Sequence, residues 1–205
     1  MLHRVLLAAA VIACFVFPSG IAKAQGILSK SEVSVSAVVE LQKFSSGNDI
    51  GQGSTNGGGF QVNYRYRFSR LFSAEADYAH ARDTQIYDGG GLGRIQTNIN
   101  AITANFVVSV PIHPFGIRPY VFGGGGKILF RPTNRGLDVV AGQVSQSPFV
   151  IDYGGGLDYG FFPHLSVRGE YRGYIVNAPN FGIGILTTGS RTHIAQPSVG
   201  LVIHF

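Results

Sequence analysis

Polar and apolar side chains alternate along most of the chain from Glu32 onward, with a period of two residues. In the segment 60–68, aromatic and valine side chains share one parity, and glutamine, asparagine and arginine side chains share the other. This alternation is typical of β-strands whose two faces meet different environments. The pattern predicts eight strands, near residues 32–43, 59–68, 72–81, 97–110, 119–130, 148–159, 165–176 and 193–205.

The segments between the predicted strands are alternately long and short. Long segments rich in glycine, asparagine and serine are expected at about 45–58, 82–96, 131–147 and 177–192. Short segments are expected at 69–71, 111–117 and 160–164. An even number of strands, with long and short connections at opposite ends, predicts an all-β fold: an eight-stranded antiparallel up-and-down transmembrane β-barrel.

The alternation alone also fits a soluble, lipocalin-like barrel, because both kinds of barrel have unlike inner and outer faces. The distribution of charged residues favours a membrane-spanning barrel over a soluble one. On the apolar register the only formal charges are Lys43 and Arg118, both at strand ends, where long side chains can reach lipid headgroups. Aromatic residues of this register gather near strand ends, as in interfacial girdles; they are Phe44, Tyr66, Phe68, Phe72, Tyr120, Phe130, Phe149, Tyr159 and Phe205.

The polar register carries charges of nearly balanced sign, which we expect to face a closed lumen. These residues are Glu40, Arg65, Arg67, Glu75, Asp77, Lys127, Asp152, Asp158, Arg168, Glu170 and Arg172. The short turn at 69–71 should bring both arginines of one strand opposite or diagonal to Glu75 and Asp77. The short turn at 160–164 should bring Asp152 and Asp158 alongside the three charged residues of the next strand. The sequence thus predicts a lumen filled by ion pairs.

Composition agrees with a single β domain. The 205 residues include 29 glycines but only 16 basic and 11 acidic residues, for a formal charge of +5. This length suits one domain of ordinary size. The basic residues are scattered, so we do not expect a nucleic-acid partner.

The first residues have the parts of a secretory signal peptide: Arg4, an apolar stretch, and small residues at Ala22 and Ala24. Cleavage is expected before Gln25. A spanning N-terminal helix and a lipoprotein anchored at Cys14 are the alternatives. The predicted regions are a signal peptide at 1–24, a short lead at 25–31 and an outer-membrane barrel domain at 32–205.

The last predicted strand places Val199, Leu201, Ile203 and a terminal Phe205 on one face. Three further motifs are Leu71–Tyr78, Arg118–Gly126 and Asp152–Asp158. In these motifs and in strand number, the chain resembles the small outer-membrane β-barrel domains, such as OmpA, OmpX and the opacity proteins. The resemblance implies an outer-membrane monomer with periplasmic termini and four outer loops. It also implies that the last strand is read by the barrel assembly machinery, and that outer-membrane lipid and lipopolysaccharide are partners.

Catalytic motifs are weak by comparison. The glycine runs at 89–93 and 123–126 precede neither a Lys-Ser/Thr pair nor a helical pattern, so they do not predict a phosphate loop. His164, Ser166 and Glu170 are similar to the residue set of lipid A deacylases, but the expected topology puts His164 in a periplasmic turn. The histidines lack metal-ligand spacing. We therefore expect no cofactor, metal or catalytic site.

The expected function is that of a structural or surface-interaction protein with long extracellular loops. A lipid-modifying barrel enzyme is the second hypothesis and a narrow channel the third. An eight-stranded barrel has an interior that its own side chains fill, so a wide pore is not expected.

Overall fold

The computed structural model describes residues 29–43, 45–47, 50–88, 93–110, 116–133, 144–177 and 191–205. The predicted signal peptide, Phe44 and most of the glycine run at 89–93 lie outside these residues. Within the described part of the chain, no helix is long and apolar enough to span a membrane.

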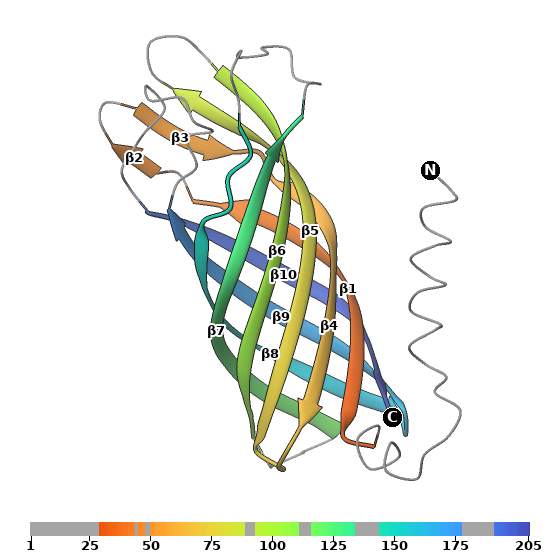
Figure 1. Ribbon diagram of the computed structural model, residues 1–205. Coiled ribbons are helices and arrows are strands. Elements are labelled where there is room, and N and C mark those ends of the chain that lie inside the picture. Colours follow the sequence, from red (N-terminus) through yellow and green to blue (C-terminus); the bar gives the residue numbers. More distant parts are fainter. Residues whose placement is uncertain are drawn as a thin grey trace, which may run out of the picture.

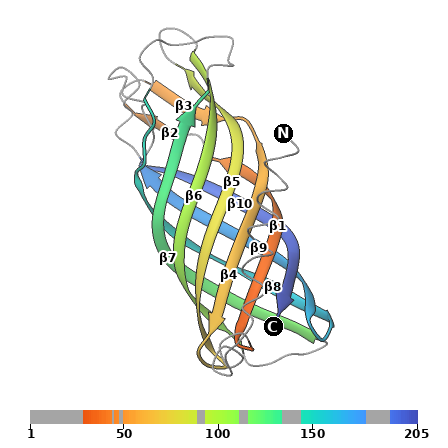
Figure 2. The ribbon, with the colours of Figure 1, turned by 45° about the vertical axis from the view of Figure 1, so that its right-hand side comes forward.

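Eight long antiparallel strands close into a barrel (Figures 1 and 2). They are β1 (Ser31–Gln42), β4 (Gly57–Arg67), β5 (Phe72–Asp88), β6 (Gly93–Ser109), β7 (Ile117–Pro132), β8 (Phe149–Phe162), β9 (Leu165–Asn177) and β10 (Arg191–His204). Each strand pairs with the next around the ring, and β1 pairs with β10 to close it. The predicted eight-stranded, antiparallel up-and-down barrel is confirmed.

Some strands run further than the sequence pattern indicates. β5 and β6 remain paired as far as Tyr87 and Gly93, through much of the segment 82–96 that was expected to be a loop. That expectation was wrong, because residues that favour strands, such as Thr84 and Ile86, continue beyond the last clear alternation. Two short strands, β2 (Ser45–Gly47) and β3 (Ile50–Ser54), also lie inside the predicted loop at 45–58. β3 pairs with the extended part of β5.

The two ends of the barrel differ. The first strand begins and the last strand ends at one end, together with the connections at 68–71 and 163–164; we call this the short-turn end (Figure 1). The β2–β3 hairpin and the extended β5–β6 hairpin project from the other end, which we call the long-loop end (Figure 2).

The outer surface of the barrel is apolar. Exposed large side chains occur on every one of the eight long strands, among them Ile102, Val121 and Phe149, which are 60–67% exposed. Buried positions alternate with these exposed ones and carry most of the charged and polar groups. The outer face therefore has the character of a surface that contacts hydrocarbon.

β7 faces the opposite way from the prediction. Tyr120 and Phe130 are buried inside the barrel, although we expected them in the outer aromatic girdle, whereas Lys127 is exposed outside it. Assigning Lys127 to the lumen and Arg118 to the outer register was therefore wrong. The pattern misleads here because both registers of β7 are apolar between Arg118 and Lys127, and the four glycines at 123–126 remove the contrast between them.

Glycines on β8 make room for the inward rings of β7. Phe122 lies opposite Gly154 and Tyr120 lies opposite Gly156 in the strand register. A Cβ atom at Gly154 would come within 2.6 Å of the Phe122 ring, and one at Gly156 would lie 2.5 Å from the Tyr120 hydroxyl. The glycines of this motif therefore serve close packing of the lumen rather than ligand binding.

Candidate functional site

The barrel interior contains a lattice of buried ion pairs whose part nearest the short-turn end is built on Arg65 and Arg168. Arg168 holds Asp158 with two hydrogen bonds, of 2.7 and 2.9 Å, and also reaches Glu32 at 2.8 Å. Arg65 lies directly opposite Glu75 in the β4–β5 register and donates to it at 2.6 Å. All these side chains are at most 5% exposed. Bidentate arginine–carboxylate bonds of this kind fix geometry as well as charge.

Further along the lumen, Arg172 binds four carboxylates. Its guanidinium lies 2.6 Å from Asp152, 3.0 Å from Glu170 and 3.1 Å from both Glu75 and Asp77. The Arg172 side chain is fully buried. One cation is therefore shared by four carboxylates, in a place from which water is excluded.

Neutral polar groups donate further hydrogen bonds to these carboxylates. The Asn105 amide donates to both Asp77, at 2.7 Å, and Asp152, at 2.6 Å. The Tyr120 hydroxyl donates to Glu170 at 2.6 Å. The Tyr120 ring lies 4.2 Å from the guanidinium carbon of Arg65, which adds a cation–π contact to the lattice.

Towards the long-loop end the lumen becomes apolar. The buried side chains there are Ala79, Ile99, Ala101, Ile128, Phe130, Val150, Tyr174, Val176 and Ile194. Glu40 lies beside this layer, and its Oε1 atom has no hydrogen-bond partner among the described residues. The interior therefore combines a charged layer with an apolar one, and the sequence pattern did not predict the apolar one.

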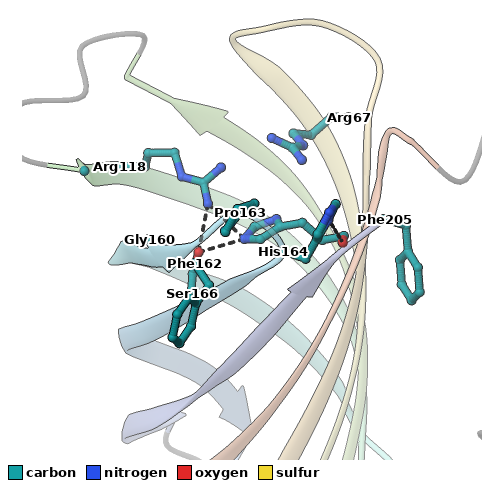
Figure 3. Close-up of a pocket in the computed structure, with 10 residues that line it drawn as sticks. Arg67, Arg118, Gly160, Phe162, Pro163, His164, Ser166 and Phe205 are labelled. Atoms are coloured by element: carbon teal, nitrogen blue, oxygen red, sulfur yellow. Dashed lines mark hydrogen bonds between the residues drawn. The ribbon is translucent and has the colours of Figure 1, made fainter.

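The short-turn end holds a pocket of about 380 Å³ inside the barrel mouth (Figure 3). Its polar lining comes from Arg67, Arg118, His164, Ser166 and His204. In Figure 3 the two arginine side chains extend from different strands towards the same space. Gly116, whose φ angle is +79°, turns the chain into β7 at the rim of this pocket.

Three residues at this mouth are arranged in the order of a serine-hydrolase triad. The Ser166 hydroxyl lies 2.8 Å from His204 Nε2, and His204 Nδ1 lies 3.2 Å from Glu32 Oε2. Arg118 Nη2, however, lies 2.9 Å from the same Nε2 atom. A general base must use this lone pair to accept the serine proton, and here the guanidinium competes for it. The arrangement is therefore better suited to holding Arg118 than to activating Ser166.

The set similar to lipid A deacylases does not assemble. Ser166 binds His204 and Arg118, whereas His164 Nδ1 contacts the backbone carbonyl of His204 at 3.3 Å. Glu170 accepts hydrogen bonds from the lattice instead. Within the described part of the chain, no group of three or more His, Cys, Asp or Glu side chains could hold a metal ion.

The structure places most of the predicted charged residues inside the barrel and brings nine of them into the lattice or its edge. These are Arg65, Arg67, Glu75, Asp77, Asp152, Asp158, Arg168, Glu170 and Arg172. Glu40 is buried apart from them. Sequence reasoning missed Glu32, which shares the parity of Glu40, and it missed Asn105 and His204, because neutral groups do not stand out on a polar register.

The four residues proposed as an assembly signal all lie on the outer face. Val199, Leu201 and Ile203 are 48–65% exposed, and the terminal Phe205 is 37% exposed. They form an apolar stripe along β10, next to β1 and β9.

Comparison with known proteins identifies similar folds. The family model described as "Outer membrane protein beta-barrel domain" matches residues 7–205. Neisserial surface protein A is 16% identical, with a TM-score of 0.63 over 86% of this chain and 98% of its own. The outer membrane protein OprG from Pseudomonas aeruginosa is 14% identical, with a TM-score of 0.56 over 88% and 98% of the two chains. No curated protein matches the sequence significantly. At these identities the two structures show a shared fold.

Proposed function

Because the chain belongs to the outer membrane protein beta-barrel domain family, we propose that this outer-membrane barrel is a structural and surface-interaction protein. In this proposal the barrel anchors the chain in the membrane, and the long-loop end contacts partners outside the cell. Family membership also sets aside the soluble, lipocalin-like alternative.

The filled interior is the observation that carries this proposal. Arg168, Arg172 and Ile128 are each at most 1% exposed, although they come from both the charged and the apolar layer. Bulk solute cannot pass two successive layers of packed side chains without displacing them. The parts left to meet other molecules are the outer face and the two ends.

We further propose that the short-turn end faces the periplasm. The signal peptide would direct export and be removed before Gln25, and the assembly machinery would read the outward stripe that ends at Phe205. Short turns on the periplasmic side and longer segments outside are the usual arrangement in bacterial outer-membrane barrels, which supports this orientation. The chain is proposed to act as a monomer.

Lipopolysaccharide is the proposed lipid partner. Arg82 lies opposite Asn98 on β6, and Asn98 lies opposite Arg131 on β7, so the three form one row on the outer face towards the long-loop end. Arg82 donates to Asn98 at 2.8 Å, and both arginines are exposed. Guanidinium groups in this position suit the phosphates of an outer leaflet.

A catalytic role is not part of the proposal. If the protein has the proposed non-catalytic function, replacing Ser166 or His204 with alanine leaves the lipid A species of the cell unchanged. A deacylated species that is present with the unmodified protein and absent with these variants would favour the lipid-modifying enzyme instead.

Surface labelling tests the proposed orientation. An epitope tag inserted between β7 and β8 should bind antibody on intact cells, whereas a tag in the turn at 69–70 should bind only after the outer membrane is permeabilised. The reverse pattern, or labelling of neither tag on intact cells, would contradict the proposal. Fast migration of unboiled protein in gels serves as the control that each tagged barrel has folded.

A further inference from the structure

Arg118 is a cation without a carboxylate partner among the described residues. In the strand register it lies opposite Asp158, yet Asp158 is held by Arg168 at 2.7 and 2.9 Å. Arg118 instead donates from Nη2 to the Ser166 hydroxyl at 3.1 Å and lies 2.9 Å from His204 Nε2. Neutral groups thus position this guanidinium and leave its charge uncompensated.

Arg67, on the opposite wall of the pocket, is only weakly compensated. Its side chain is 34% exposed and lies 3.8 Å from Glu32. Glu32 is closer to two buried arginines, at 2.8 Å from Arg168 and 3.3 Å from Arg65. Glu32, the one carboxylate that forms an ion pair with Arg67 among the described residues, is therefore already engaged inside the lattice.

The pocket between these two arginines has the lining of an oxyanion site. None of its lining side chains is acidic, and the terminal carboxylate of Phe205 forms no ion pair with either arginine among the described residues. Two guanidinium groups from separate strands, with a serine hydroxyl beside one of them, offer several N–H and O–H donors to one small anion. The space of about 380 Å³ exceeds what a phosphate group occupies.

We propose that this pocket binds a phosphate-type oxyanion, supplied either as free phosphate or as the phosphate of an anionic lipid headgroup. Such a ligand would receive charge-assisted hydrogen bonds from Arg67 and Arg118, and the exposed ring of Phe162 at the rim leaves room for an attached apolar group. This site lies at the end of the barrel opposite to the proposed surface-interacting loops. A result that overturns the anion site therefore leaves the proposed surface-interaction function unaffected, and the reverse also holds.

The test uses the folded protein in nanodiscs, with backbone amide NMR signals of Gly116, Gly160 and Ser166 as reporters. Inorganic phosphate is titrated into discs of pure phosphatidylcholine, against sodium chloride of equal ionic strength. In a second arm, part of the phosphatidylcholine is replaced by phosphatidylglycerol. The variants are Arg118→Gln, Arg67→Gln and, as a matched control, Arg191→Gln at the exposed start of β10, at the opposite end of the barrel from the pocket.

The site predicts saturable shifts of the three reporters with at least one probe. Arg118→Gln or Arg67→Gln should weaken binding about tenfold or more, and Arg191→Gln should leave it unchanged. A response to phosphate assigns the free anion, and a response to phosphatidylglycerol alone assigns the lipid headgroup. No response to either probe overturns the site. An equal response in Arg67→Gln and the unmodified protein, or an equal loss in Arg191→Gln, also overturns it. Arg67→Gln keeps the test valid if Arg118→Gln does not fold.

Discussion

Replacing Arg172 with methionine tests the buried lattice at its most connected point. The substitution keeps most of the side-chain volume but removes the charge that lies 2.6 Å from Asp152 and 3.0–3.1 Å from three other carboxylates. Glu75 would keep Arg65 at 2.6 Å, and Glu170 would keep the Tyr120 hydroxyl. Asp77, Asp152 and Glu170 would keep only neutral donors among the described residues, so their charges would be left uncompensated.

The expected loss is large because the site excludes water. Removing one partner of a buried ion pair costs about 3–5 kcal/mol, whereas an exposed pair contributes less than about 1 kcal/mol. We therefore expect Arg172→Met to lower the free energy of unfolding by about 3–5 kcal/mol. Arg131→Met makes the same substitution at an exposed site and should change the free energy of unfolding by less than about 1 kcal/mol.

The assay is urea unfolding in lipid vesicles, followed by the loss of the fast-migrating band of unboiled protein. A second substitution sharpens the result: Asp152→Asn in the Arg172→Met background removes one uncompensated charge and should recover part of the loss. The two changes should therefore be non-additive by about 0.5–3 kcal/mol. Equal losses for Arg172→Met and Arg131→Met, or strict additivity with Asp152→Asn, would refute the account of the lumen.

Three further predictions concern packing, the outer face and assembly. Gly156→Ala should lower the free energy of unfolding by about 1–3 kcal/mol through overpacking. Gly169→Ala is the control and should not lower it, because a Cβ atom there has no atom within 4 Å. Equal effects of the two substitutions in urea unfolding would contradict the packing of Tyr120 against β8. Lys127→Leu should leave the urea midpoint of unfolding in vesicles unchanged or raise it, because the side chain is outside the barrel. A large decrease in this midpoint would indicate that the Lys127 side chain faces the lumen. Deleting Phe205 should reduce the folded protein in cell membranes more than it reduces stability after refolding in vitro, and equal membrane levels would argue against an assembly role.

Much of the fold follows from alternation, because membrane and lumen impose opposite demands on neighbouring residues. β4 shows this: Arg65 contrasts with the aromatic residues beside it, and the short turn at 69–71 then determines that it faces Glu75. The charge-bearing side of such a strand can be predicted from composition alone.

β7 shows where this reasoning fails. Arg118 lies on one register, whereas Lys127 and Arg131 lie on the other, so charge does not distinguish the two faces. Four glycines and apolar residues occupy most of the positions between Arg118 and Lys127. Only the neighbouring strands decide the orientation, since Gly154 and Gly156 on β8 leave space for Phe122 and Tyr120 inside. The pocket was missed for a related reason: it depends on β7 placing Arg118 inside, and on contacts between residues as distant as Arg118 and His204.

Conductance of the purified protein in planar lipid bilayers tests directly whether the barrel is closed by its own side chains and acts through its surfaces. We expect no stepwise current from the unmodified protein over a range of voltages in potassium chloride, because the lattice around Arg172 and the apolar layer around Ile128 both block the lumen. Steady single-channel currents from the correctly folded, unmodified protein would contradict the account and favour the narrow channel.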